Sequence, residues 1–457
     1  MLRAALLVLL ATCTSVASAR VCSVWPGSGT IKQALANTCD TIIIHTGTYR
    51  EGTITIERPV VLLGQGWPVI DGGGVGEVVV VSAPHVTLQG LVVRGTMVSD
   101  MNDNAGIKCI SVTDIRIIGN RVESCFFGIY LSSVTHALVA DNRVIGDPMA
   151  DENRRANGIH LWKCSHVEVL RNTAMHHRDG IYLEFVTDSH VGNDTTAYNA
   201  RYGLHFMFSH RDSYTRNLFH DNGAGVAVMF TREVTMTDNR FEHNRGASSY
   251  GLLLKEINDA HIERNMFVDN TVGILLDGCN RANVTDNRFQ ANGWAVKLFA
   301  NSTAAVFERN GFSGNTFDMT TNGDLVLTTL KGNYWDRYRG YDLDRDGRGD
   351  VPHRPLSVFA LVTERMPYAM VLSRSLMVNL LDQGERLVPT LTPAMLQDTG
   401  PLMHPPDRSG EQHARRSVEQ YGERTLVPSA LVAAIMVLHT WWSFTDRPIL
   451  RSTGPHG

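Results

Sequence analysis

The most distinctive chemical groups in this 457-residue sequence are histidines and methionines that follow regularly spaced glycines. His205, Met207 and Met229 are the strongest candidate metal ligands, and His160 and Glu184 occupy comparable positions in neighbouring repeats. Thioether and imidazole groups together form a soft ligand set, which suits copper and in particular Cu(I). The alternative is that these side chains only cover one face of a sheet, as a protein interface would.

A second group of candidate ligands precedes the same glycines. It comprises Met175, His176, His177, His220 and His243. Histidines are ordinary residues in turns, so residue type alone makes this group the weaker candidate for a metal site.

A cluster of carboxylates follows the periodic region. Asp342, Asp344 and Asp346 alternate along the chain before a glycine, and Asp350 follows. This pattern resembles the start of a calcium-binding loop, because Ca²⁺ prefers oxygen ligands. The twelfth position from Asp342 is His353, where an EF-hand requires glutamate. The sequence therefore predicts either a calcium site or a solvated acidic turn.

The candidate soft ligands lie in a region that repeats about every 22 residues. A glycine followed by apolar residues recurs at Gly106, Gly128, Gly158, Gly180, Gly203, Gly225, Gly251 and Gly273. An asparagine before a turn recurs at Asn120, Asn142, Asn172, Asn193, Asn217, Asn239, Asn265, Asn287 and Asn310. The longest glycine interval, 30 residues, holds a polar insertion at 147–155. This period, with short alternating strands between turns, predicts a solenoid.

We predict that residues 20–355 form a right-handed parallel β-helix with one coil per repeat. Coils stack about 4.8 Å apart, so equivalent residues form rows along the helix. Residues one and three positions after each glycine should fill the interior, whereas those two and four positions after it should face outwards. This phase gathers His205, Met207 and Met229 on the exterior, near Glu184 and His160. The asparagines should form an internal ladder that satisfies backbone groups.

The two ends of the chain differ from the repeats. Residues 1–19 combine Arg3, an apolar stretch and Ala-Ser-Ala, as expected of a secretory signal. Residues 356–407 are expected to form a helical cap and a proline-rich extended segment, because the open end of a solenoid needs cover. A linker at 408–425 leads to 426–444, an apolar stretch expected to be a membrane-associated helix, and to a tail at 445–457. The alternative for 426–444 is a helix docked on the body or on a membrane partner.

Export places the mature chain in an oxidising compartment. Six of the seven cysteines remain after the signal is removed. Cys22 and Cys39 flank the first mature segment and are the best candidates for a disulfide, whereas Cys109 belongs to an interior row. A formal charge of −4 gives no basic footprint for a nucleic-acid partner.

Several phrases resemble the NosD family of periplasmic nitrous oxide reductase maturation factors. They are RYGLHFM at 201–207, GVAVM at 225–229, YGLLLKE at 250–256, NGWA at 292–295, NYWD at 333–336, GYDLDRDGRGD at 340–350 and PLM at 401–403. The resemblance covers residues 22–406 and implies an assembly factor that is not an enzyme. His205, Met207 and Met229 lie within the matching phrases.

The resemblance also implies partners. Copper, with sulfide as a second candidate cargo, is expected to pass from a copper-chaperone lipoprotein through this protein to apo nitrous oxide reductase. There it would help to build the copper–sulfide centre. The protein would act in the periplasm, at the inner-membrane surface, beside an ABC transporter permease and ATPase complex.

Two other functions are left open by the residues. A β-helix also hosts carbohydrate-active enzymes such as uronan lyases and epimerases, and the inserted residues 147–151 would be their best catalytic candidate. Such an enzyme needs paired carboxylates, and Glu184 has few acidic neighbours in its row. The other alternative is an adaptor that holds the reductase against the transporter without binding metal.

Overall fold

The computed structural model describes residues 20–99, 101–323, 327–373, 375–388 and 392–406. The chain divides into two units, Met1–Pro405 and Pro406–Gly457, and the first unit holds the solenoid. Across the described ranges, no helix is both long and apolar enough to cross a membrane. The segments predicted as signal (1–19), linker (408–425), apolar helix (426–444) and tail (445–457) lie outside the described residues.

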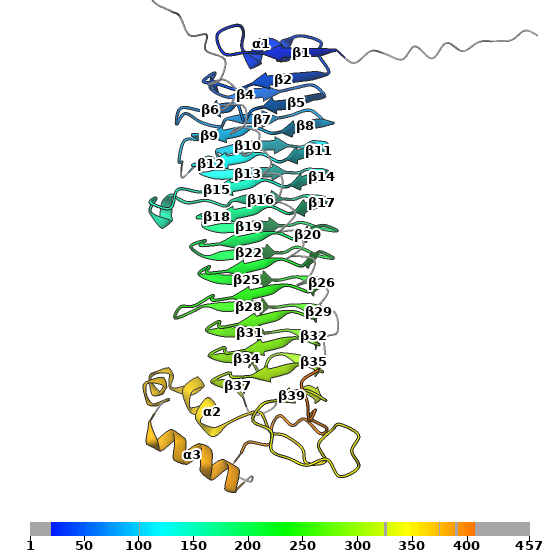
Figure 1. The fold of residues 1–457 in the computed structure, drawn as a ribbon, viewed down its shortest axis with the longest axis vertical. Helices are drawn as coiled ribbons and strands as arrows, with labels where there is room; N and C mark the ends of the chain where they lie inside the picture. Colours follow the sequence, from blue (N-terminus) through cyan, green and yellow to red (C-terminus); the bar gives the residue numbers. More distant parts are fainter. Residues whose placement is uncertain (1–19, 100, 324–326, 374, 389–391, 407–457) are drawn as a thin grey trace, which may run out of the picture. The chain divides into compact units, whose positions relative to one another are not determined.

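The first unit is a parallel β-solenoid of about 13 turns with about 23 residues per turn, which confirms the predicted β-helix (Figure 1). Its strands form three parallel sheets, and each strand pairs with its counterparts in the coils before and after it. Parallel strands stacked in this way share their backbone hydrogen bonds between coils, so the repeat length fixes which residues lie side by side.

The first sheet contains β1 (Val21–Val24), β2 (Thr41–His45), β5 (Val60–Gln65), β8 (Val86–Gln89), β11 (Thr113–Ile118), β14 (Thr135–Ala140), β17 (Ser165–Leu170), β20 (His190–Gly192), β23 (Ser213–Thr215), β26 (Arg232–Thr237), β29 (Asn258–Glu263), β32 (Asn280–Thr285), β35 (Thr303–Glu308) and β38 (Leu327–Lys331). The second contains β4 (Ile54–Ile56), β7 (Val79–Val81), β10 (Ala105–Ile110), β13 (Phe127–Ser132), β16 (Ile159–Trp162), β19 (Asp179–Glu184), β22 (Tyr202–Met207), β25 (Ala224–Met229), β28 (Tyr250–Lys255), β31 (Val272–Asp277), β34 (Trp294–Leu298) and β37 (Phe317–Thr320). The third contains β3 (Thr48–Tyr49), β6 (Val69–Asp71), β9 (Val92–Arg94), β12 (Arg121–Glu123), β15 (Arg143–Ile145), β18 (Thr173–Met175), β21 (Thr195–Ala197), β24 (Leu218–His220), β27 (Arg240–Glu242), β30 (Met266–Val268), β33 (Arg288–Gln290), β36 (Gly311–Ser313) and β39 (Tyr334–Trp335).

Apolar rows fill the interior as predicted. The row three positions after each repeat glycine is fully buried: Cys109, Leu131, Leu161, Leu183, Phe206, Val228, Leu254 and Leu276. A further interior row stacks aromatic rings from Phe219 to Trp335, with successive centroids 4.2–5.3 Å apart. These rows join successive coils into one continuous core.

Buried asparagines form the predicted ladder, with one correction. Asn217 is typical: its side-chain oxygen accepts from the backbone N–H of the preceding coil, and its amide donates to Val191. The prediction that Asn193 belongs to this ladder is wrong, because Asn193 is exposed at a turn with φ 57°. The ladder position is taken by Asp194, which accepts from the backbone N–H of Asn172 at 2.5 Å. Asparagine tolerates the left-handed conformation that this turn requires.

A second asparagine ladder, which the sequence analysis missed, follows another corner of the coils. Its members are Asn199, Asn222, Asn244, Asn270, Asn292 and Asn315. The first five stand nineteen residues after a repeat glycine, so a search for a second regular spacing within the same repeats could have found them.

The amino-terminal coil carries a short helix, α1 (Ile31–Ala36), capped by Thr30 and Gln33. The predicted disulfide between Cys22 and Cys39 is confirmed, with their Cα atoms 5.9 Å apart. The four other cysteines of the described chain are free and buried: Cys109, Cys125, Cys164 and Cys279.

A helical segment follows the last coils, as predicted. It consists of α2 (Val358–Arg365), η2 (Pro367–Leu372) and α3 (Leu376–Leu387), while the short helix η1 (Glu152–Arg154) lies in the earlier polar insertion. Phe359 of α2 packs with Phe317 of β37 and Val378 of α3. An ion pair of 2.8 Å joins Glu364 to Lys297. These contacts attach the helices to the final coils.

Candidate metal centre

Met207 and Met229 lie side by side on adjacent strands. They end β22 and β25, whose parallel register pairs Met207 with Met229 and His205 with Ala227. Such partners have Cα atoms about 4.8 Å apart. Both methionine side chains are partly exposed. The register predicted from the glycine spacing is therefore confirmed, and it places two partly exposed methionines side by side.

His205 is held in one orientation by a buried carboxylate. Its Nδ1 lies 3.4 Å from Oδ2 of Asp179, and the guanidinium of Arg201 bonds both oxygens of the same carboxylate. The Nε2 atom of His205 is buried and has no hydrogen-bond partner. Nη2 of Arg201 also lies 3.4 Å from Nδ1. When Nδ1–H donates to the carboxylate, the lone pair lies on Nε2, which is the usual arrangement of a metal-binding histidine.

Asp179 is fully buried on β19, the strand next to β22. Burial alone raises its pKa, but hydrogen bonds from Arg201 and His205 outweigh burial, so the pKa of Asp179 lies below its ordinary value. Asp179 is therefore ionised at neutral pH and can orient the imidazole.

An aromatic row connects these residues along the outer side of the second sheet. The rings of Tyr130, His160, Tyr182 and His205 stack in that order, with centroids 4.8, 4.7 and 4.6 Å apart. The hydroxyl of Tyr182 donates to Sδ of Met207 at 3.6 Å. Tyr182 therefore packs on the imidazole of His205 and also contacts one thioether.

The prediction that the row two positions after each glycine is exposed is wrong. Tyr130, His160, Tyr182, His205 and Ala227 are at most 8% exposed. These residues lie outside the main interior cluster, but their large rings cover one another from coil to coil. In the same coils, the row four positions after the glycines, which holds Glu184 and the two methionines, stays partly exposed.

His160 faces Glu184. Burial lowers the pKa of His160 to about 3, so the ring is neutral. Its Nε2 lies 3.9 Å from Oε2 of Glu184, whose strand position is paired with Met207. The five predicted ligands thus form one strip, which we call the soft-donor strip: His160, Glu184, His205, Met207 and Met229.

The second predicted group does not form one site. Within the described ranges, one group of three or more His, Cys, Asp or Glu side chains lies close enough to hold a metal ion. That group is Asp342, Asp344 and Asp346, which we call the aspartate loop. His177 is buried, His220 packs edge-on against Tyr198, and His243 lies 3.7 Å from Asp269.

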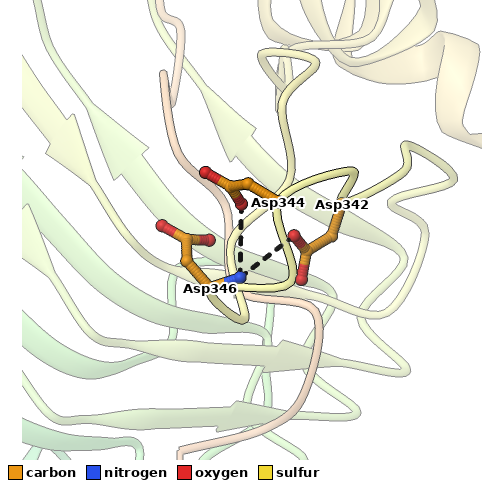
Figure 2. Close-up of side chains that lie close together, drawn as sticks. All are labelled: Asp342, Asp344 and Asp346. Atoms are coloured by element: carbon orange, nitrogen blue, oxygen red, sulfur yellow. Dashed lines mark hydrogen bonds between the residues drawn. The ribbon is translucent and has the colours of Figure 1, made fainter.

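Three of the four predicted calcium ligands gather in the aspartate loop (Figure 2). Carboxylate oxygens of Asp342, Asp344 and Asp346 lie within 4.8 Å of one another. The backbone N–H of Asp346 donates to both other carboxylates at 3.2 Å. Asp350 is outside that group, and its carboxylate accepts from the backbone N–H of Leu343 at 2.7 Å. Calcium binding by this loop stays a prediction.

Comparison with known proteins places the soft-donor strip inside a matched region. A family model described as "NosD: Periplasmic copper-binding protein (NosD)" matches residues 140–340. A protein from Pseudomonas aeruginosa named "Probable ABC transporter binding protein NosD" is 29% identical over 375 residues, covering 78% of this chain and 86% of the relative. A protein of the same name from Stutzerimonas stutzeri is 28% identical over 383 residues, covering 79% and 86%.

Solved structures support the fold alone. The catalytic unit of a GH87 α-1,3-glucanase from Streptomyces thermodiastaticus superposes with a TM-score of 0.51 at 17% identity. The match covers 68% of this chain and 67% of the glucanase. This likeness says that the chain is a β-solenoid and nothing about its chemistry.

The fold and the comparisons together describe a β-solenoid that is similar to a family of periplasmic copper-binding proteins. The chain is similar to the NosD family over residues 140–340, and to these two relatives over most of its length. Its curated relatives are named as binding proteins and not as enzymes.

Proposed function

We propose that this protein carries Cu(I) and delivers it to apo nitrous oxide reductase, where it serves assembly of the copper–sulfide centre. The observation that carries this proposal is the pairing of Met207 with Met229, beside a histidine whose Nε2 is free. Copper is cargo here, so the protein needs a site that holds the ion and also releases it.

The ligands that we propose are Nε2 of His205 and the thioethers of Met207 and Met229. Soft sulfur donors select Cu(I), and the neutral imidazole completes a set of three. Asp179 acts as a positioning residue, because its contact with Nδ1 keeps Nε2 unprotonated. Glu184 borders the set and adds one negative charge near the cation.

Release is favoured by the partial exposure of the two methionines. A structural metal site is usually closed by four ligands, whereas three ligands leave a position open. A donor group of the receiving protein can enter that position before the thioethers dissociate. The chain therefore acts by ligand exchange and needs no catalytic residue.

The partners belong to the same proposal. The names of the curated relatives support an ABC transporter as one partner. We propose that the protein meets it at the periplasmic surface of the inner membrane. We further propose a copper-chaperone lipoprotein as donor and the reductase as acceptor, with sulfide as an additional cargo.

The test is a pair of conservative substitutions on the full chain. Met207→Leu with Met229→Leu keeps the side-chain volume but removes both sulfurs. Met266→Leu, on the third sheet and similarly buried, is the matched control. We expect the double variant alone to lose Cu(I) after anaerobic loading and desalting, and to leave apo-reductase without its copper–sulfide centre.

Two results would contradict the proposal. Full cluster assembly by the double variant would exclude the thioether pair as the delivery site. A wild-type chain that retains no copper but still supports assembly would instead establish a metal-free adaptor.

A further inference from the structure

Three exposed phenylalanines form a ridge on one corner of the solenoid. Phe185, Phe208 and Phe230 directly follow β19, β22 and β25, which are consecutive strands in the middle of the second sheet (Figure 1). Successive rings stack with centroids 5.3 and 5.0 Å apart. Phe185 is 43% exposed and Phe230 is 37% exposed, although each ring is stacked on a neighbour. We call these three residues the phenylalanine ridge.

The fold does not require aromatic side chains in this row. Ser133 and Lys163 occupy the row in the coils before the ridge, and Glu256 and Gly278 occupy it in the coils after. Ser133, Lys163 and Glu256 adopt the same left-handed backbone, with φ between 52° and 55°. Polar residues therefore satisfy this turn. Contiguous exposed apolar groups with a polar rim mark interaction surfaces, so the ridge indicates contact with another molecule.

The ridge is continuous with the exposed part of the soft-donor strip. Met207 and Met229, which are partly exposed, directly precede Phe208 and Phe230 in the chain. Aromatic residues and methionine are enriched at the centres of protein interfaces. The apolar surface is thus two side chains wide across these coils, which favours a protein as the occupant.

The row that forms the ridge ends in opposite charges at equal distances from its centre. The strand register places Lys163 two coils before Phe208 and Glu256 two coils after it. Two coils correspond to about 10 Å. Both charged side chains are exposed, and within the described chain neither takes part in an ion pair.

We propose that two copies of this chain associate through the phenylalanine ridge, antiparallel and related by a two-fold axis at Phe208. Such a contact is isologous, because the same surface serves both copies. It places Phe185 of one copy against Phe230 of the second copy, and Lys163 against Glu256. The apolar groups are then covered, and an ion pair forms at each end. A parallel pair would instead bring Lys163 against Lys163.

The neighbouring row supports the same axis. Trp162 and Lys255 stand two coils before and two coils after Met207. In the antiparallel pair, the ammonium of Lys255 faces the indole of Trp162 in the second copy, where a cation–π contact is favourable. This indole already attracts a cation within one chain, since Nζ of Lys163 lies 4.3 Å from the ring centroid.

Association through the ridge covers Met207 and Met229 as well. If these thioethers hold cargo as proposed above, the dimer withholds it, and delivery requires the monomer. The ridge is narrow, so the interface belongs to the small end of the size range and the dimer dissociates on dilution. The association itself does not rest on the delivery function.

Sedimentation equilibrium of the full chain, in mild detergent and without copper, tests the association. We expect a reversible dimer for the wild type and a monomer for Phe208→Asp, because aspartate tolerates the left-handed turn. Tyr198→Asp is the matched control, since Tyr198 is 50% exposed with φ 56° but lies in another row. A dimeric Phe208→Asp variant, or a wild type that stays monomeric at the highest attainable concentration, would overturn the proposal.

Charge reversal tests the antiparallel orientation. Lys163→Glu and Glu256→Lys should each weaken association about tenfold, because each places like charges opposite one another at both ends. The two reversals together should restore the wild-type affinity. A double variant as weak as the single ones would exclude this orientation.

Cysteine cross-linking locates the axis. Phe208→Cys should give a disulfide between copies, because residue 208 of each copy lies on the axis. Phe185→Cys should not, because the equivalent residues stand two coils apart, beyond the span of a disulfide. The reverse result would refute the proposed axis. Because these measurements need no copper, failure of the dimer and failure of the delivery site give different results.

Discussion

Replacing Asp194 by asparagine is expected to stabilise the protein at neutral pH. Asp194 is a carboxyl between the ladder amides of Asn172 and Asn217, and its Oδ1 accepts from the backbone N–H and the side-chain amide of Asn172. Its Oδ2 is buried without a partner. In the flanking coils the ladder amides of Asn172 and Asn217 donate to the carbonyls of Val139 and Val191. An asparagine at 194 would donate in the same way to Val169, which lies between those valines in register.

The size of this stabilisation follows from the pKa of Asp194. Burial raises it from 3.8 to about 8, despite hydrogen bonds from Asn172 that lower it. Between these two values the folded state keeps the proton while the unfolded state has lost it, so the free energy of unfolding falls as the pH rises. At pH 7 the solution lies about 3 pH units above the pKa of the unfolded carboxyl. This difference corresponds to a loss of about 4 kcal/mol in the free energy of unfolding. Asp194→Asn should abolish this loss and should match the wild type near pH 4.

Urea unfolding of both proteins across the pH range measures this difference, and calorimetric Tm values give a second readout. The matched control is Asn217→Asp in the next coil, where the side-chain oxygen accepts from the backbone N–H of Asp194. The control should lose stability as the pH rises. Parallel stability profiles for the wild type and Asp194→Asn between pH 4 and pH 8 would refute the assignment of a neutral carboxyl to the ladder.

Three further outcomes are expected. Replacing Cys22 and Cys39 together by serine should lower the free energy of unfolding by about 3 kcal/mol, as closure of a short loop predicts, and an unchanged urea midpoint would contradict this. Asp179→Asn should weaken Cu(I) binding about 10–100-fold in a chelator competition, because His205 loses the group that fixes its tautomer, and unchanged affinity would exclude the positioning role. Ca²⁺ should raise the Tm of the wild type but not of Asp344→Asn, and the absence of any shift in the wild type would exclude calcium from the aspartate loop.

The sequence predicts the solenoid and the thioether pair because both depend on one quantity, the length of a coil. Regular glycine spacing sets that length, and backbone pairing between coils then aligns Met207 with Met229. The disulfide can also be predicted from the sequence, since Cys22 and Cys39 flank the first coil.

Other features depend on neighbours that spacing does not reveal. Asn193 and Asp194 are adjacent polar residues, and only the backbone conformation decides which turns inwards. The burial of His160 and His205 depends on the large rings of the adjacent coils.

Stacked coils have a consequence for partial unfolding. The strands of each coil pair only with those of the coils on either side, so the solenoid behaves as a linear array of repeats. Unfolding of such an array starts at the termini. The strands β22 and β25 stand sixth and fifth from the β37 edge of their sheet, with several strands beyond them on the other side. Fraying of either terminus therefore leaves the region of Met207 and Met229 intact until several neighbours have melted.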